Sequence, residues 1–352
     1  MAENTPSSRP ATPLSSEPND LSSREGDHSD SDSAFVDSAS RHTESVASSA
    51  YAYRFANGRR YHAYDGEAYQ FPNDESEQDR LDLQHHIFRL CADNRLYLAP
   101  IPADLHSVLD VGTGTGIWAI EFADEHPSAT VVGIDLSPIQ PNNVPVNCSF
   151  RVDNLELDWI PEEKYDFIHS RAMVGAIKDW PRFLAQSFDH LKPGGYIELQ
   201  DLTSPVCCND PTESSNSIMV KYGNHVLDAG RRIGLDFQAP YKWREMLQEA
   251  GFVDINIRWF NWPIGPWAKG VKNKMIGRYL YVDFHEGLEV ARLLFTNVLG
   301  WSSNDFDNLI AQVRAEMEEQ KIHLYERVCF CYARKPGGAP AETPNDDYQT
   351  QV

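Results

Sequence analysis

Short apolar runs alternate with helical patterns through the middle of the chain. The first run ends at Val111, three glycines follow at alternate positions, and a helical pattern continues from Ile117 through Ala123. A second helical pattern spans residues 182–191 and leads into a Lys-Pro-Gly-Gly turn. We predict strands over residues 108–111, 131–135, 149–153, 165–169 and 196–201. A βαβ order throughout predicts an α/β fold with a doubly wound, parallel sheet and a ligand at the carboxyl ends of its strands.

The patterns on either side of this core are less regular. Asp74, with Glu77 three residues later, is an N-cap candidate for a helix that extends to about Tyr97. That helix either covers the ligand cleft or, with the aromatic residues before it, packs on the sheet. After the core we predict helices over residues 218–233, 243–250, 284–299 and 305–322, and strands over 253–260 and 327–333.

Composition divides the chain into one domain and two tails. Residues 1–50 are rich in Ser, Pro, Asp and Glu, so they cannot bury enough apolar surface to offset the entropy of ordering. We expect them to form an acidic, disordered tail, and residues 337–352 to form a second one. Residues 51–336 are expected to form one domain, with an N-terminal lid over 51–100, a core over 105–202, and cap insertions over about 203–240 and 261–322.

The spacing of the glycines limits the class of ligand. The dinucleotide fingerprint requires glycine at its first, third and sixth positions, but the sixth position here is Ile117. What remains, Asp110 followed by G-x-G-x-G, resembles the first motif of class I methyltransferases that use S-adenosylmethionine. That ligand carries a sulfonium cation and no phosphate, so a carboxylate beside the loop is favourable. Asp135 ends the second strand about twenty residues later, where a carboxylate can accept hydrogen bonds from ribose hydroxyls.

The resemblance to class I methyltransferases implies a full set of cofactor contacts. An acid after the third strand, Asp153, would accept from the adenine amino group, and the backbone N–H that follows would reach the ring. A surface loop also carries Asp and Asn freely, so a structural interpretation of Asp153 stays open. The cofactor-binding residues are predicted to be Asp110, Gly112, Thr113, Gly114, Gly116, Asp135, Leu136, Asp153 and Asn154.

Longer stretches of the chain resemble the fungal LaeA-like methyltransferases. The most specific are Ile117-Trp118-Ala119 and Pro138-Ile139-Gln140-Pro141. The resemblance implies a Rossmann-like, seven-stranded, mostly parallel sheet with an antiparallel last strand, helical insertions that cap the cleft, and a role in secondary metabolism. Some relatives methylate a pathway intermediate, whereas others are regulators in a nuclear complex with velvet-type proteins; both remain open. The matching stretches are residues 57–62, 79–82, 109–119, 133–141, 180–181 and 332–336.

Charge and apolar content exclude several partners. The formal net charge of −21 argues against direct binding of nucleic acid or an anionic membrane. No apolar run approaches the roughly eighteen residues of a membrane span, and the N-terminus lacks a signal-peptide core. We therefore expect a cytoplasmic or nuclear protein that is not secreted. The six cysteines match no zinc or disulfide spacing, and no metal is expected.

Methyl transfer from a sulfonium is an in-line displacement, in which the protein mainly positions the acceptor and excludes water. His169, at the carboxyl end of the fourth strand, is the candidate base for a small-molecule oxygen acceptor, or else a structural hydrogen bonder. Arg171 either anchors an anionic acceptor or pairs with a nearby acid. Three tryptophans would either line a hydrophobic acceptor pocket or form a packed cap: Trp259, Trp262 and Trp267.

Overall fold

A computed structural model describes residues 53–62, 70–160, 162–209 and 211–337. The predicted disordered tails, residues 1–50 and those after 337, lie outside the described residues. Within the described ranges, no helix combines the length and the hydropathy needed to cross a bilayer.

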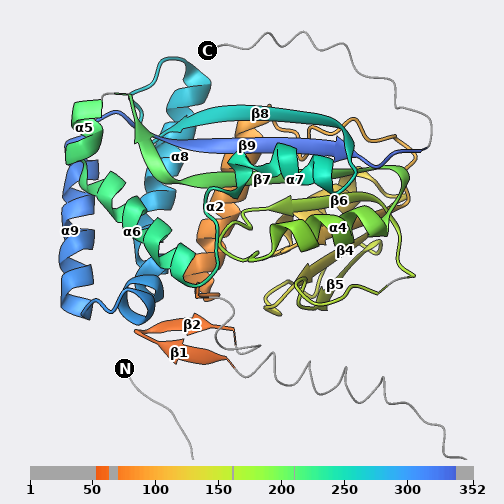
Figure 1. Cartoon of the computed structure of the whole chain (residues 1–352), viewed down its shortest axis with the longest axis horizontal. Helices are drawn as coiled ribbons and strands as arrows, with labels where there is room; N and C mark the ends of the chain where they lie inside the picture. The colour runs from red at the N-terminus through yellow and green to blue at the C-terminus, as the bar shows by residue number, and fades with distance from the viewer. Residues whose placement is uncertain (1–52, 63–69, 161, 210, 338–352) are drawn as a thin grey trace, which may run out of the picture.

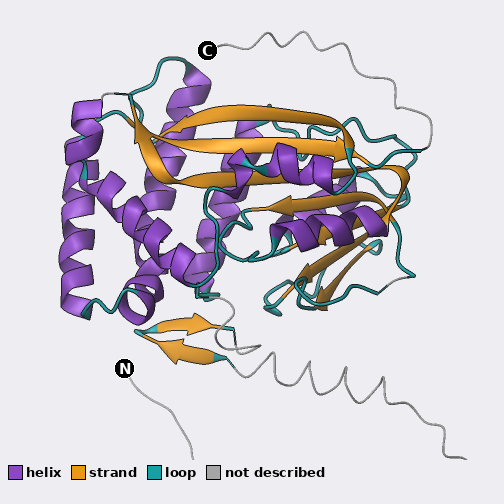
Figure 2. Cartoon of the chain, viewed as in Figure 1, coloured by secondary structure: helices purple, strands orange, loops and turns teal. Residues whose placement is uncertain are grey.

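A seven-stranded sheet forms the centre of the molecule (Figure 2). Its strand order is β5-β4-β3-β6-β7-β9-β8, and the five strands from β5 to β7 are parallel. β9 runs antiparallel to both of its neighbours. The seven-stranded, mostly parallel sheet expected from the sequence is thus confirmed. The strands are β3 (Ser107–Val111), β4 (Thr130–Asp135), β5 (Cys148–Val152), β6 (Tyr165–Arg171), β7 (Leu191–Cys208), β8 (Val253–Pro263) and β9 (Leu324–Arg334).

Helices flank the sheet, and several of them gather at one of its ends. α5, α6, α8 and α9 lie together at the left of Figure 1, whereas α4 and α7 lie along the sheet. A short hairpin, made of β1 (Arg54–Ala56) and β2 (Arg59–Tyr61), comes before the first helix, α2. The helices are α2 (Glu75–Cys91), α3 (Ile117–Glu125), α4 (Trp180–His190), α5 (Pro211–Asn216), α6 (Ile218–Arg232), α7 (Trp243–Glu249), α8 (Val271–Gly287) and α9 (Ser303–Glu319).

The prediction of a βαβ order throughout is wrong for two crossovers. β4–β5 and β5–β6 are connected without a helix in the residues that the structure describes. Residues 136–147 contain prolines at 138, 141 and 145, each of which lacks the N–H that a helix interior needs. Only the β3–β4 and β6–β7 crossovers within the parallel part contain helices, α3 and α4.

Three predicted boundaries also need correction. α2 has Asp74 as its N-cap, as predicted, but ends at Cys91 because Asp93 and Asn94 adopt positive φ. β7 continues past Asp201 to Cys208, so the expected cap insertion at 203–240 begins inside the sheet. The helix predicted over 284–299 is wrong: α8 starts at Val271, and short 3₁₀ and π segments replace its expected second half. Its N-cap, Gly270, makes no side-chain capping bond, so the sequence held no start signal there.

Replacement of Gly277 by alanine should destabilise the protein. The N–H of Gly265 donates to the carbonyl of Gly277 at 2.9 Å, and a Cβ on Gly277 would lie 2.1 Å from the Gly265 oxygen. Alanine gains about 0.5–1 kcal/mol in helix propensity, but overpacking costs about 1–3 kcal/mol. We therefore expect urea unfolding to show a net loss of about 1–2 kcal/mol for Gly277→Ala. Val282→Ala, at an exposed site on the same helix, should change stability by less than about 0.5 kcal/mol; equal stabilities would contradict the close approach.

Candidate active site

The turn from β3 to α3 brings three left-handed glycines to the carboxyl edge of the sheet. Gly112, Gly114 and Gly116 have φ of 69°, 56° and 82°. A Cβ on Gly112 would lie 2.1 Å from the Met173 sulfur, and one on Gly116 would lie 2.4 Å from the ring of Phe150. At Gly114 the nearest atom would be a methyl of Leu81 at 3.8 Å, so this part of the loop has free space above it.

A buried carboxylate, that of Asp110, stabilises the glycine loop through hydrogen bonds. Asp110 of β3 accepts from the Thr113 hydroxyl at 2.6 Å and from His169 Nδ1 at 2.8 Å. His169 is fully buried, and its ring stacks on Trp118 with centroids 3.8 Å apart. Burial lowers the pKa of His169, although Asp110 opposes that shift. The neutral ring therefore donates from Nδ1 and fixes the Asp110 carboxylate in place.

A second carboxylate, that of Asp135, also forms a hydrogen bond with the glycine loop. Asp135 accepts from the backbone N–H groups of Gly114 and Ser137, both at 2.9 Å, and burial raises its pKa. The Gln140 amide donates to the carbonyls of Gly114, at 2.7 Å, and Ser137, at 2.9 Å. Sequence reasoning missed Gln140, although it noted the specific motif that contains it. Leu136, which follows Asp135, is half-buried.

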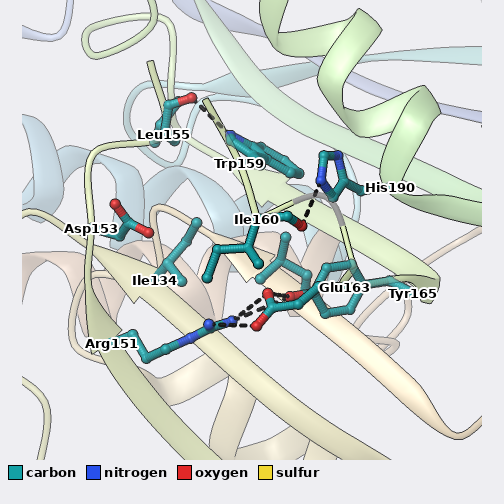
Figure 3. A pocket seen from close by; sticks show the side chains of 10 residues that line it. Ile134, Arg151, Asp153, Leu155, Trp159, Ile160, Glu163, Tyr165 and His190 are labelled. Atoms are coloured by element: carbon teal, nitrogen blue, oxygen red, sulfur yellow. Dashed lines mark hydrogen bonds and ion pairs between the residues drawn. The ribbon is translucent and has the colours of Figure 1, made fainter. Parts of the chain in front are cut away.

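Asp153 and Asn154 follow β5, and the Asp153 N–H donates to the Asp135 carbonyl at 3.0 Å. Asp153 is exposed, and its carboxylate accepts from the Asn154 N–H at 2.8 Å. Asp153 also lines a cavity of about 20 Å³, in which the Arg151 guanidinium pairs with Glu163 at 2.7 Å (Figure 3). That volume holds about one water, not an adenine ring. The adenine contact of Asp153 therefore stays a prediction.

Helix α2 crosses above the loop. The Thr115 hydroxyl donates to Asp82 at 2.7 Å, and His85 Nε2 lies 2.9 Å from Glu121. Arg171 Nη2 lies 2.7 Å from His85 Nδ1, and a guanidinium can only donate. The imidazole is therefore neutral, accepting at Nδ1 and donating from Nε2 to Glu121. Burial and Arg171 lower the pKa of His85 to about 4, while the bond from His85 lowers that of Glu121 to about 2.

Arg171 ends β6 beside this network. Its guanidinium lies 5.1 Å from the centre of the Phe88 ring, and burial lowers its pKa to about 10. Among the ion pairs of the described residues, none involves Arg171. The acid that the sequence offered as its alternative partner is thus not found, and its role towards an anionic acceptor stays a prediction.

A cavity of about 230 Å³ lies beside the carboxyl-terminal half of β7 and the segment that follows β6. Its walls come from α2, β7, α6, α8 and the segment after β6, with Glu326 contributed by β9. Among the described residues, no three His, Cys, Asp or Glu side chains gather as a metal site would require.

The tryptophan group lies outside this cavity. Trp262 packs on Phe88 with ring centroids 4.8 Å apart, and Trp259 stacks on Tyr241 at 4.7 Å. Trp267 stacks on His323, also at 4.7 Å. The structure favours packing over an acceptor pocket for these three residues.

Comparison with known proteins decides the family. Residues 83–257 match the family described as a methyltransferase domain. The chain is 42% identical to methyltransferase pytC of Aspergillus terreus over 294 residues, covering 83% of this chain and 91% of pytC. The chain belongs to the methyltransferase family. It is also 36% identical to the secondary metabolism regulator LAE1 of Cochliobolus heterostrophus, over 80% of this chain and 94% of LAE1. Identity to the probable methyltransferase tdiE of Emericella nidulans is 33%, over 77% of this chain and 85% of tdiE.

The methyltransferase uses S-adenosylmethionine, and the residues at the loop fit this cofactor. The space above Gly114 admits a ligand that rests on the backbone, and Asp110 and Asp135 supply negative charge towards a cation. The sequence placed these residues together correctly because they are close in the chain. The placement of His169 beneath the loop gives no support to a catalytic base, because a base must reach the proton of the acceptor.

Asp135→Asn should weaken binding of S-adenosylhomocysteine in a calorimetric titration by about 10- to 100-fold. Loss of the charge weakens hydrogen bonds worth about 1.5–3 kcal/mol and loosens the Gly114 backbone. Asp158→Asn removes a carboxylate whose side chain is 96% exposed and should leave the affinity unchanged. An affinity within twofold of the wild type in folded Asp135→Asn would refute the assignment of this carboxylate to the cofactor site.

Stability should fall as the pH drops from about 6.5 towards 4, and His85→Gln should flatten that dependence. His85 titrates near 4 when folded and near 6.5 when unfolded, so only the unfolded chain gains its proton in this window. The full effect is on the order of 3 kcal/mol, at about 1.36 kcal/mol per pKa unit. Glutamine can accept from Arg171 and donate to Glu121 without titrating. Parallel urea curves for both proteins at pH 7 and 4.5 provide the measurement, and identical pH dependences would contradict a neutral His85.

Proposed function

We propose that this methyltransferase methylates an oxygen of a neutral small molecule, an intermediate of fungal secondary metabolism. The observation that carries the proposal is the cavity of about 230 Å³ next to the cofactor loop. Val174 lines the cavity, and its neighbour Met173 lies against Gly112. An acceptor in the cavity would therefore lie beside the loop that binds the methyl donor.

The charges around the cavity favour a neutral acceptor. Among the described residues that line it, Arg80 is the one basic side chain. Arg80 already pairs with Asp283 at 2.8 Å and Glu77 at 2.7 Å. A carboxylate acceptor would meet no free cation there and would lie near Asp283. An alcohol, enol or phenol avoids the cost of burying a charge without a partner.

The protein's own residues would contribute by orientation and by exclusion of water. S-adenosylmethionine supplies the electrophilic methyl group. α2, tied to the loop through Thr115 and Asp82, covers the site and limits access of water. Arg171, with no carboxylate partner among the described ion pairs, is suited to the carboxylate of the cofactor. The Asp110–His169 pair holds the loop in register with the cavity.

A second candidate is a regulator of secondary metabolism that works in a nuclear complex with velvet-type proteins. Its support is the 36% identity to a protein named as a secondary metabolism regulator, over most of both chains. This candidate uses the same cofactor site, but it acts through a surface that binds a protein partner.

One labelling experiment separates the two candidates. The purified protein is incubated with methyl-labelled S-adenosylmethionine, below saturation, and small-molecule extracts from a strain that lacks the gene, with Asp135→Asn as the control of weakened cofactor binding. We expect one extracted compound to gain a labelled methyl group on oxygen, as identified by mass spectrometry and NMR. Absence of any labelled small molecule, together with loss of several unrelated metabolites in the deletion strain, would favour the regulator.

A further inference from the structure

Glu326 is a buried carboxyl group with an unused hydrogen-bonding atom at the wall of the acceptor cavity. It lies on β9, is 4% exposed, and lines the cavity together with Thr203 and Ser204 of β7. Its Oε1 has no hydrogen-bond partner among the described residues. An unsatisfied buried polar atom is costly, so an atom of this kind at a cavity wall calls for a ligand.

The neighbouring Asp201 shows what a purely structural carboxylate looks like in this sheet. Asp201 accepts from the backbone N–H groups of Met173, at 2.6 Å, and of Val174 and Leu202, both at 2.9 Å. Its hydrogen-bonding capacity is used within the fold, and it does not line the cavity. Glu326 differs on both counts.

The protonation of Glu326 determines what it offers to a ligand. Burial raises its pKa well above the usual value, and the nearby carboxyls of Asp283 and Asp201 add to that shift. The backbone N–H groups of Thr203 and Arg327 oppose it without reversing it. Burial therefore favours the neutral, protonated form of the acid. A protonated carboxyl group has one O–H to donate.

The remaining walls of the cavity are mostly apolar. Phe71, Leu202, Val226, Phe237 and Leu288 line it. Its volume of about 230 Å³ exceeds that of the roughly 150 Å³ apolar cavity known to bind benzene. A substituted aromatic ring is therefore a suitable occupant.

We propose that Glu326 selects the acceptor by donating a hydrogen bond from its carboxyl group to a neutral oxygen, such as a carbonyl, on an aromatic molecule. The proposal rests on the proposed function in that it takes this cavity as the acceptor site. Glu326 is a specificity-determining residue in this scheme, and no proton leaves it during methyl transfer.

A matched pair of probes tests the hydrogen bond without knowledge of the natural acceptor. Acetophenone carries a carbonyl, whereas α-methylstyrene has nearly the same shape with a CH₂ group in place of the oxygen. Binding of each probe is measured by ligand-observed NMR on the full chain saturated with S-adenosylhomocysteine. We expect the wild type to prefer acetophenone by roughly fivefold, the value for one net hydrogen bond.

Variants of Glu326 locate the preference. Glu326→Gln retains an N–H donor and should keep the preference, whereas Glu326→Leu should lose it. Glu245→Leu, at an exposed position on α7, should behave as the wild type. Unchanged affinity for S-adenosylhomocysteine shows that each variant is folded. If Glu326→Leu fails this check, Glu326→Met, which also lacks a donor, takes its place.

The outcomes separate this proposal from the function on which it rests. Failure of acetophenone to bind, or equal binding of both probes to the wild type, would overturn the role of Glu326 even if oxygen methylation is observed. A carbonyl preference that Glu326→Leu abolishes would support it even if no labelled metabolite is found. A preference that survives Glu326→Leu would overturn it, because another group would then be the donor.

Discussion

The carboxylate of Asp110 is the contact on which the cofactor site depends. Asp110 and His169 are register partners on β3 and β6, and their side chains form a hydrogen bond beneath the glycine turn. Thr113 occupies the second oxygen, and Trp118 of α3 stacks on the imidazole. One buried charge therefore joins two strands, the turn and the helix that follows. Such a charge is tolerated in an apolar core only because both of its oxygens are satisfied.

Helix α2 links the cofactor side of the site to the acceptor side. Leu81, Asp82 and His85 face the glycine loop, β6 and α3, whereas Arg80 and Gln84 line the cavity. Residues three or four positions apart share a helix face, so one helix presents two different surfaces to the two sites. A ligand bound on either side should therefore affect the other side, because both sides contact the same rigid helix.

The sequence predicted the glycine loop, its acidic neighbours and most strands, because each rests on a local pattern. The turn needs positive φ at every second residue, three times in all, and glycine adopts this conformation without a steric penalty. The crossovers without helices, the start of α8 and the role of Gln140 depend on contacts between distant segments, for which local patterns carry little signal. Glu326 could not be singled out from the sequence, since its burial depends on β7, β9 and α8 meeting at one place. His169 was correctly placed on β6, although that strand continues to Arg171, and its orientation into the core depends on Asp110 and Trp118.

The hydrogen bonds that Asp201 accepts from the backbone N–H groups of Met173 and Val174 have an evolutionary consequence. They fix the short segment that separates the glycine loop from the cavity, so the spacing between the loop and the cavity is set by the sheet. The far walls, from α6 and α8, contribute no bond to that segment and can change without disturbing it. New acceptors are then accessible through mutations in two helices alone. A family with this arrangement can diversify its products while it keeps the same loop for binding the methyl donor.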